Sequence, residues 1–334
     1  MTSMKMWYLL LLAAVLSIVP TVAEVVKSVS DCDQFLLNKT PPDVTSILEG
    51  KKMDENRYKF ICQTYDNKRR FLTLYDTKNK IPVYSAYKYT GGTEKGPFKR
   101  PKWKIEPQLE GKTNEKMMCN ADDNTIYVKQ AGIKDYKTKE GFNKGHLIPY
   151  SYGSTTSDKK STCTLTNIVP QAITFNGGSW STMEMCVKCV MDKYCKINNG
   201  GTKAYVVTGA IPNDRNKQLN KKINIPDKLW SAFCCYSPEE KKWIASAHWG
   251  ENVPENESEE KNEKYVKIET LEELLNKLKV DVFPGKECPR HTKISFTQNL
   301  TTAHAPPLLK PLLPVPCNIC PFHHNIWSTI SSPA

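Results

Sequence analysis

The sequence predicts an α+β fold in which a mostly antiparallel central sheet is flanked by helices. Residues 70–75 and 81–89 are rich in Tyr, Val, Leu and Phe and are separated by a polar turn, which predicts a β-hairpin. Apolar residues recur at helical spacing in 179–194 and again in 271–280. With 334 residues, 39% of them hydrophobic, the chain can form one large globular domain or two small ones.

The later strands and the last helix follow from the same patterns. Three apolar runs are expected to form a second β layer: 204–208, 229–236 and 243–249. His248 lies in the last run, where the simplest interpretation is a core or hydrogen-bonded histidine. The helix at 271–280 is amphipathic, and Thr270 with Glu273 forms a possible capping box at its start.

Residues 1–23 have the character of a secretory signal peptide. Lys5 supplies the positive end, 6–19 are almost wholly apolar, and 21–23 are small residues suited to cleavage before Glu24. A membrane anchor is the alternative, but the apolar run is shorter than the roughly 20 residues that a span needs. We therefore expect a secreted, extracellular protein whose mature chain has no membrane span. N-glycosylation acceptor sequences begin at Asn38, Asn256 and Asn299.

The twelve cysteines all follow that segment, and in a secreted chain they predict mostly disulfides of undetermined connectivity. Cys186 and Cys189 lie one turn apart on the predicted helix, a spacing that redox and zinc pairs share. No second pair follows at a zinc-ribbon spacing, which favours bridges to other parts of the fold, or free thiols. Residues 290–334 are proline-rich and are expected to form a disordered tail. The tail contains Cys317-x-x-Cys320-x-x-His323-His324, which has zinc-ligand residue types, but these are crowded and lie in a proline-rich context that disfavours a zinc site.

The charge balance points to acidic partners. The formal net charge is +12, and loss of Lys5 with the signal peptide lowers it to +11. Residues 95–104 hold five cations and no acid, and four more lysines lie at 134, 137, 139 and 144. Such a surplus favours nucleic acid or an anionic surface, although each cluster can equally be a solvated face.

The stretch 141–184 holds the candidate catalytic residues. His146 follows a glycine and precedes a short apolar run, so it is expected on or beside a strand near a turn. Asn176 is followed by two glycines and a serine, which predicts a helix N-terminus there. Glu184 comes eight residues later, about two helical turns on, so both side chains can share a helix face. The expected arrangement is strand, loop and helix, with a histidine base at one end and oxygen ligands at the other.

These residues resemble the signature of the DNA/RNA non-specific endonucleases, the ββα-metal nucleases. The Gly-His at 145–146 precedes Asn176-x-x-x-Trp180-x-x-x-Glu184 by the family's thirty residues, and 167–171 read Asn-Ile-Val-Pro-Gln. The stretches 61–63, 81–87 and 206–209 are similar to the secreted vertebrate branch, the endonuclease domain-containing 1-like proteins. The resemblance runs from about residue 31 to 289. It implies a nuclease domain at 24–289 with a ββα-metal core.

The resemblance further implies a secreted endonuclease that hydrolyses phosphodiester bonds of DNA and/or RNA with little sequence preference, because it contacts the phosphate backbone. His146 would be the general base, since neutral imidazole accepts protons near pH 7. Asn176 would ligate Mg²⁺, or another divalent cation such as Mn²⁺, and Glu184 would orient water beside it. Lys144 would contact a phosphate, and Asn167 and Gln171 would also bind substrate.

The sequence departs from the family signature at two positions. Asn143 stands where the family has aspartate, and Lys144 where it has arginine. Lysine keeps the positive charge but cannot make the planar two-point contact with phosphate that arginine makes. The alternative function is therefore a weak or inactive pseudo-nuclease that binds nucleic acid or another extracellular partner. The oligomeric state does not follow from the sequence.

Overall fold

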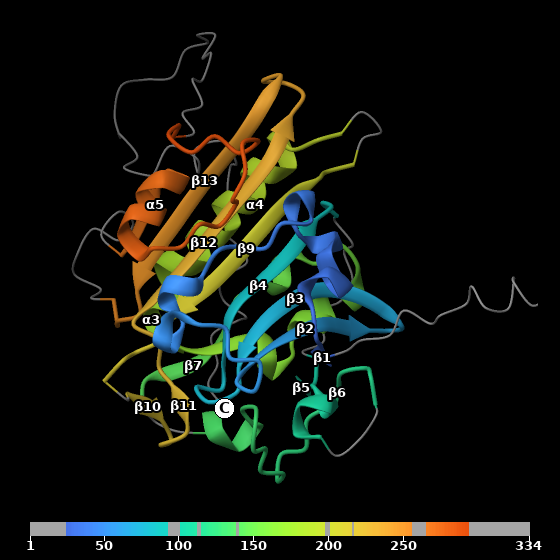
Figure 1. Cartoon of the computed structure of the whole chain (residues 1–334), viewed down its shortest axis with the longest axis vertical. Coiled ribbons are helices and arrows are strands. Elements are labelled where there is room, and N and C mark those ends of the chain that lie inside the picture. Colours follow the sequence, from blue (N-terminus) through green and yellow to red (C-terminus); the bar gives the residue numbers. More distant parts are fainter. Residues whose placement is uncertain are drawn as a thin grey trace, which may run out of the picture.

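The computed structural model describes residues 25–92, 101–111, 115–137, 140–197, 201–215, 217–255 and 265–293. The predicted signal peptide (1–23) and most of the predicted tail (290–334) lie outside these ranges. The described residues form an antiparallel eight-stranded sheet in the order β1-β2-β3-β4-β9-β12-β13-β14, with helices on both sides (Figure 1). The predicted α+β class with a central antiparallel sheet is confirmed.

The first half of the sheet contains the predicted hairpin. Its strands are β1 (Val25–Val26), β2 (Tyr58–Tyr65), β3 (Lys68–Asp76) and β4 (Ile81–Tyr89). Asp66 and Asn67 join β2 to β3 with φ values of 53° and 54°, as the tightest hairpin turns require. The aromatic residues of β3 and β4 are core residues, since Tyr75, Tyr84 and Tyr89 are all at most 1% exposed.

The second half corrects the expected second β layer. Its strands are β9 (Ala204–Ile211), β12 (Lys228–Ser237), β13 (Lys242–Glu251) and β14 (Val266–Glu269). β9 pairs directly with β4, with Thr208 opposite Ser85, so these strands extend the first sheet. Local apolar runs predict strands but do not identify their partners, so this pairing does not follow from the sequence pattern.

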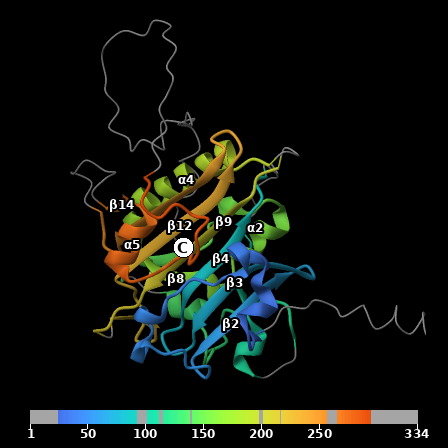
Figure 2. The same ribbon diagram turned by 45° about the horizontal axis from the view of Figure 1, so that its top comes forward.

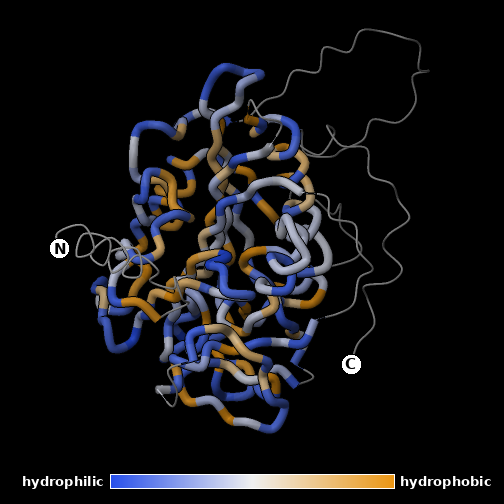
Figure 3. Tube along the Cα trace, turned by 90° about the vertical axis from the view of Figure 1, so that its right-hand side faces the viewer, coloured by the Kyte–Doolittle hydropathy of each residue, from blue (hydrophilic) through white to orange (hydrophobic). Residues whose placement is uncertain are grey.

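The sheet separates two hydrophobic cores. Along β12, Leu229 and Phe233 face one core while Trp230 and Ala232 face the other, because successive side chains on a strand point to opposite sides. The first core is covered by α4 (Ser181–Tyr194), which runs alongside β9 and β12 (Figure 2). Hydrophobic segments run through the interior and hydrophilic ones gather at the outer turns (Figure 3).

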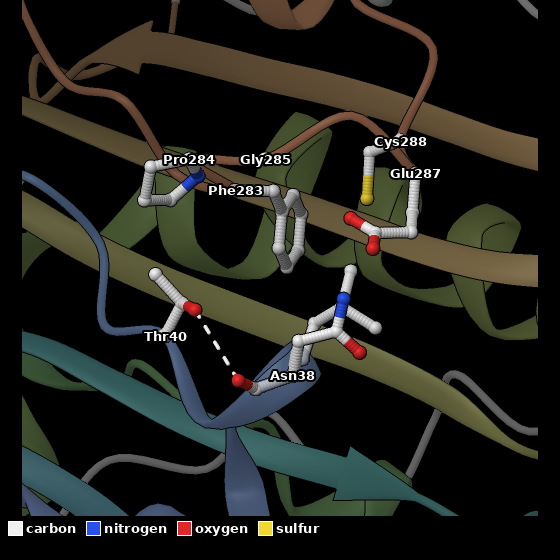
Figure 4. Close-up of a pocket in the computed structure, with 8 residues that line it drawn as sticks. Asn38, Thr40, Phe283, Pro284, Gly285, Glu287 and Cys288 are labelled. Carbon is white, nitrogen blue, oxygen red and sulfur yellow. Dashed lines mark hydrogen bonds between the residues drawn. The ribbon is translucent and has the colours of Figure 1, made fainter.

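The second core is covered by N-terminal turns and by α5 (Leu271–Leu278). The predicted capping box of α5 is confirmed: the Glu273 backbone N–H donates to Thr270 Oγ1 at 3.1 Å, and the Thr270 N–H donates to Glu273 Oε2 at 2.7 Å. The helix ends at Leu278 because Lys279 adopts a left-handed conformation. Beside this core a hollow is lined by Leu37, Asn38, Thr40, Phe283, Pro284, Gly285, Glu287 and Cys288 (Figure 4).

The remaining elements are short. The helices are α2 (Thr156–Thr162), α3 (Ile173–Phe175) and the π turn η9 (Asn176–Trp180). The small strands are β5 (Lys104–Ile105), β6 (Cys119–Asn120), β7 (Phe142–His146), β8 (Ile168–Ala172), β10 (Gln218–Leu219) and β11 (Ile223–Asn224). The 3-10 turns are η1 (Val29–Phe35), η2 (Leu37–Lys39), η3 (Thr45–Ile47), η4 (Glu49–Lys51), η5 (Pro107–Glu110), η6 (Ile133–Tyr136), η7 (Tyr150–Tyr152) and η8 (Leu165–Asn167).

Disulfides join the covering layers to the sheet. The described pairs are Cys32–Cys62, Cys195–Cys235 and Cys234–Cys288. Cys234 and Cys235 are neighbours on β12 and point to opposite faces, so one strand anchors the end of α4 on one side and the C-terminal segment on the other. The prediction of disulfides is confirmed. Among the described helices, none is long and apolar enough to cross a bilayer.

Candidate active site

The candidate site is built on one ββα unit. β7 pairs antiparallel with β8, which places Asn143 opposite Gln171 and His146 opposite Ile168. β8 then leads without a break into α3, η9 and α4. Residues that are about thirty positions apart in the sequence are therefore brought together by one strand pair and the helix that follows it.

Asn176 does not begin a helix, which corrects the prediction. The helix starts three residues earlier at Ile173, and Asn176 has helical φ and ψ angles of −61° and −46°. It opens the π turn, in which Gly178 departs from helical geometry at φ −101° and ψ −115°. π turns inside helices are frequent at functional sites. Because this turn is wider than an α-helical turn, sequence spacing alone does not fix how Asn176 and Glu184 are oriented.

Asn143 and Asn176 form a hydrogen-bonded amide pair. Asn176 Nδ2 donates to Asn143 Oδ1 at 2.8 Å. This contact joins strand β7 to the π turn and uses the nitrogen end of the Asn176 amide. The oxygen end of Asn176, which is the end that a hard cation would bind, is left available by this arrangement.

His146 is half-buried at the end of β7. Its ring lies 5.5 Å from the Trp103 ring, centroid to centroid, and its Nε2 is 3.7 Å from the Cys163 Sγ. Burial lowers the pKa of His146 to about 4. The imidazole is therefore neutral at physiological pH, the state in which it can accept a proton.

Lys144 lies between two aromatic rings. Its Nζ is 5.5 Å from the centroid of Trp103 and 5.4 Å from that of Tyr136, both within cation–π range. Lys104, by contrast, is buried and donates to the carbonyl oxygens of Lys102 and Lys160. Its contribution is structural, while Lys95, Lys99 and Arg100 of the same basic stretch lie outside the described residues.

Asn167 and Gln171 are both completely buried. Asn167 Nδ2 donates to the carbonyl oxygens of Ile148 and Thr162, and its Oδ1 accepts from the Ile148 N–H. Its amide thus holds the loop after β7 and leaves no donor for a substrate. Gln171 differs, because neither end of its buried amide has a hydrogen-bond partner among the described residues.

The Gln171 side chain also explains Gly145. A Cβ atom at position 145 would overlap Gln171 Oε1, well inside van der Waals contact. Position 145 of the Gly-His motif must therefore be glycine, because any larger residue on β7 would displace the Gln171 side chain that packs against it. A buried, unpaired amide next to the base strand indicates a position where a further polar group can bind.

Glu184 lies on α4, half-buried, and burial raises the pKa of its carboxyl to about 8. The carboxyl is thus largely protonated at neutral pH. The Glu184 carbonyl oxygen accepts a hydrogen bond from the Tyr152 hydroxyl at 3.1 Å. Trp180, which the motif also contains, is 1% exposed and packs 5.5 Å from the Phe175 ring, so its role is to fix the helix in the core.

Two residues that support the site had no signal in the sequence. Asn252 Oδ1 accepts from the Ala172 N–H at 2.8 Å, and its Nδ2 donates to the Pro170 carbonyl at 2.9 Å. Glu255 accepts from the backbone N–H of Ser179 at 3.0 Å, and also from its hydroxyl. The segment after β13 therefore fastens both β8 and the π turn. Locally this segment has the composition of an ordinary surface turn.

The donor set around β7 and η9 suits a hard divalent cation. The polar groups gathered there are the amides of Asn143, Gln171 and Asn176, and amide oxygens are ligands that Mg²⁺ accepts. Among the described residues no three His, Cys, Asp or Glu side chains converge. A cation here would have few protein ligands and would rely on Asn176 Oδ1.

The fold is that of the ββα-metal class, whose members generally use divalent metal ions. Residues 50–286 match the family model described as DNA/RNA non-specific endonuclease, and the chain belongs to that family. The predicted family is thereby confirmed, and a nucleic acid substrate is what the family implies.

Curated relatives agree with this assignment. The endonuclease domain-containing 1 protein of Homo sapiens is 29% identical over 214 residues, which cover 62% of this chain and 39% of that protein. The Mus musculus protein of the same name is 28% identical over 217 residues, covering 63% and 40%. The chain thus spans about two-fifths of the length of these relatives. The solved structure of an EndoG/EndoGI complex is similar to this chain with a TM-score of 0.45 and 15% sequence identity. The match covers 65% of this chain and 83% of that one.

Proposed function

We propose that this protein is a metal-dependent endonuclease that hydrolyses phosphodiester bonds of DNA and/or RNA with little sequence preference. The observation that carries the proposal is the amide pair of Asn143 and Asn176 on the same ββα unit as a neutral His146. In this proposal the base and the oxygen ligand, the two groups that phosphodiester hydrolysis requires from the protein, both come from one ββα unit.

His146 acts as the general base in this proposal. Its Nε2 faces the Cys163 sulfur at 3.7 Å, so a proton on Nε2 can point at the sulfur and leave the lone pair on Nδ1. Nδ1 then takes the proton of the attacking water. A pKa of about 4 keeps the ring unprotonated and ready to accept it.

Asn176 Oδ1 would hold the cation, and the hydrogen bond to Asn143 would keep that amide in the required orientation. A divalent cation bound there, Mg²⁺ or Mn²⁺, would neutralise the charge that develops on the phosphate. Gln171 and Glu184 supply further polar groups from β8 and α4, with Glu184 orienting water. Asn167 acts indirectly, since its amide holds the loop behind His146.

Lys144 binds a phosphate as a point charge. The rings of Trp103 and Tyr136 hold its ammonium group in place, which reduces the entropy lost on binding. The contacts proposed so far are all with the phosphate backbone, so little base preference is expected.

The test is nicking of supercoiled plasmid by the purified protein, with Mg²⁺ or Mn²⁺ and with EDTA. His146→Ala should lower the rate by about 10²–10⁴-fold because it removes the proton acceptor. His291→Ala is the matched control, since His291 is an exposed histidine on the C-terminal segment. A wild-type protein that binds DNA but never cuts it under these conditions would establish the alternative, a pseudo-nuclease.

Secretion belongs to the same proposal. The disulfides fit an oxidising compartment. Residues 1–23 would direct the chain there and be removed, so the purified native protein should begin at or near Glu24. N-terminal sequencing that finds Met1 instead would contradict this.

A further inference from the structure

One end of the sheet carries three aromatic side chains at the margin of the second core. Tyr205 lies on β9, Tyr236 on β12 and Trp243 on β13, and these three strands are neighbours in the sheet. Tyr236 is 46% exposed, and the other two residues are half-buried. A single exposed ring is ordinary, but three rings on adjacent strands form a patch to which a ligand can bind. We call these three residues the aromatic band.

The strand register places the three rings on the same face of the sheet. Tyr205 lies opposite Cys234, and Tyr236, two residues after Cys234, lies opposite Trp243. Side chains two residues apart on a strand point to the same side, and Cys234 belongs to the second core. The Tyr236 and Trp243 rings are 6.0 Å apart, centroid to centroid, at an angle of 75°. Tyr205 is a diagonal neighbour of Tyr236, a separation that aromatic side chains can span.

The aromatic band lies on the opposite side of the sheet from the candidate active site. Residues of β8 and α4 pack into the first core, and Figure 1 shows α4 behind β9 and β12. The band borders the second core, next to the Cys234–Cys288 disulfide that joins the C-terminal segment to β12. A ligand on the band is therefore held apart from the residues of the candidate site.

Two lysines adjoin the band. Lys88 of β4 lies directly opposite Tyr205, so its side chain is on the same face of the sheet. The Nζ of Lys203, which comes just before β9, is 5.8 Å from the centroid of the Tyr205 ring. The aromatic band thus has positive charge beside it, and positive charge favours an anionic ligand.

The turn between β12 and β13 does not cancel this charge. Its two acids are Glu239 and Glu240, and each has a basic neighbour. Glu240 Oε2 is 3.3 Å from Lys242 Nζ, and Glu239 interacts electrostatically with Lys193 at the end of α4. The two lysines next to Tyr205 therefore give this end of the sheet a net positive charge.

We propose that the aromatic band binds single-stranded nucleic acid, at a second site apart from the candidate active site. Bases stack on the three rings, and phosphates pair with Lys88 and Lys203. Sheet faces that combine aromatic rings with positive charge suit single strands, because every base has a flat face to stack and every linkage carries a negative charge. Pairing hides the faces of the bases in a duplex, so the band prefers single strands. This binding does not depend on whether the protein cuts.

The test measures binding in EDTA, so that cleavage plays no part. A fluorescently labelled oligothymidylate of about 12 nucleotides is titrated with the intact protein and followed by anisotropy. The same strand paired with its complement is the control ligand. Tyr236→Ala should weaken single-strand binding about five- to a hundredfold, the contribution of one stacked base, and leave duplex binding unchanged. Tyr236→Phe keeps a ring and should bind as wild type does.

The lysines are tested by the salt dependence of the same binding. Lys88→Ser and Lys203→Ser should each lower the slope of log K against log salt concentration by about 0.7, the value for one phosphate contact on a single strand. Lys52→Ser is the matched control, because it removes the same charge from an exposed lysine in the N-terminal turns, and it should leave the slope unchanged.

Cross-linking locates the bound strand. An oligonucleotide that contains iodouracil is irradiated with the protein, and the linked residues should be Tyr236 or Trp243. Equal single-strand affinity of wild type and Tyr236→Ala, or cross-links confined to the ββα unit at 142–184, would overturn the proposal. A dimer in sedimentation that Tyr236→Ala dissociates would also overturn it, because the band would then be an interface between two copies of the chain. So would binding of a neutral oligosaccharide in place of the oligonucleotide.

Discussion

The Asn143→Asp substitution tests how the site orients its metal ligand. In the structure Asn176 Nδ2 donates to Asn143 Oδ1. An asparagine can also donate, so the pair has a second orientation in which Asn176 Oδ1 accepts from Asn143 and its nitrogen faces the cation. A carboxylate at position 143 can only accept, which makes the productive orientation of Asn176 the only hydrogen-bonded one.

The magnitude follows from the population of competent molecules. If the two amide orientations have similar energies, about half of the molecules can bind the cation, and the apparent dissociation constant is raised about twofold. The Asn143→Asp substitution removes this twofold loss of apparent affinity, because only the productive orientation of Asn176 remains, and it adds a negative charge near the proposed cation position. We expect the Mg²⁺ concentration for half-maximal rate to fall about two- to tenfold, which corresponds to roughly 0.4–1.4 kcal/mol.

The assay is the initial rate of supercoiled-plasmid nicking across a Mg²⁺ titration at fixed salt and DNA. Asn143→Ala should raise the half-saturating concentration, because it leaves the Asn176 amide unsupported. Asn124→Asp, at an exposed site, adds the same charge and should change nothing. A half-saturating concentration that is unchanged or higher in Asn143→Asp would refute the reasoning.

The same series extends to the second departure from the family signature. Lys144→Arg would place a planar guanidinium between Trp103 and Tyr136, where it can stack and also grip a phosphate at two points. Combined with Asn143→Asp it should raise the cleavage rate about ten- to a hundredfold, or roughly 1.4–2.8 kcal/mol, and the two adjacent changes need not be additive. If the double variant is no faster than wild type while wild type cuts well, these two positions do not limit the reaction.

Three further predictions concern pH and stability. Because burial holds the pKa of His146 at about 4, the nicking rate should be lost as the pH falls through about 4, and a midpoint near pH 6.5 would contradict the lowered pKa. The same shift affects stability. Between pH 6.5 and 4 the unfolded state binds more protons than the folded state, so the free energy of unfolding falls as the pH falls through this range. Asn252→Ala leaves three backbone groups without partners and should cost about 2–4 kcal/mol in urea unfolding, against almost nothing for the exposed Asn124→Ala. Burial raises the pKa of Glu184 from an ordinary 4.5 to about 8, so its carboxyl destabilises the folded state increasingly as the pH rises from 4.5 to 8. Glu184→Gln should therefore be more stable than wild type at pH 9 and as stable as wild type at pH 4. Equal stability of the two proteins at both pH values would refute the raised pKa.

The candidate residues of the site are predicted from the sequence alone and do not depend on knowledge of the fold. His146, Asn176 and Glu184 stand in a motif with fixed spacing, and a motif of that kind is local information. The hairpin of β3 and β4 and the capping box at Thr270 and Glu273 were predicted for the same reason: each depends on residues only a few positions apart.

What the tertiary structure decided are the relations between distant residues. The pairing of β4 with β9 makes one sheet where two layers were expected. Asn252 and Glu255 come from beyond β13 to fasten β8 and the π turn, and nothing in their local sequence marks them. Burial, which sets the pKa of His146 and directs the Asn167 amide inward, is likewise a sum over neighbours from several elements. Local sequence determines which side chains are available to a site. Long-range packing determines how these side chains are oriented and, through burial, which protonation state they have.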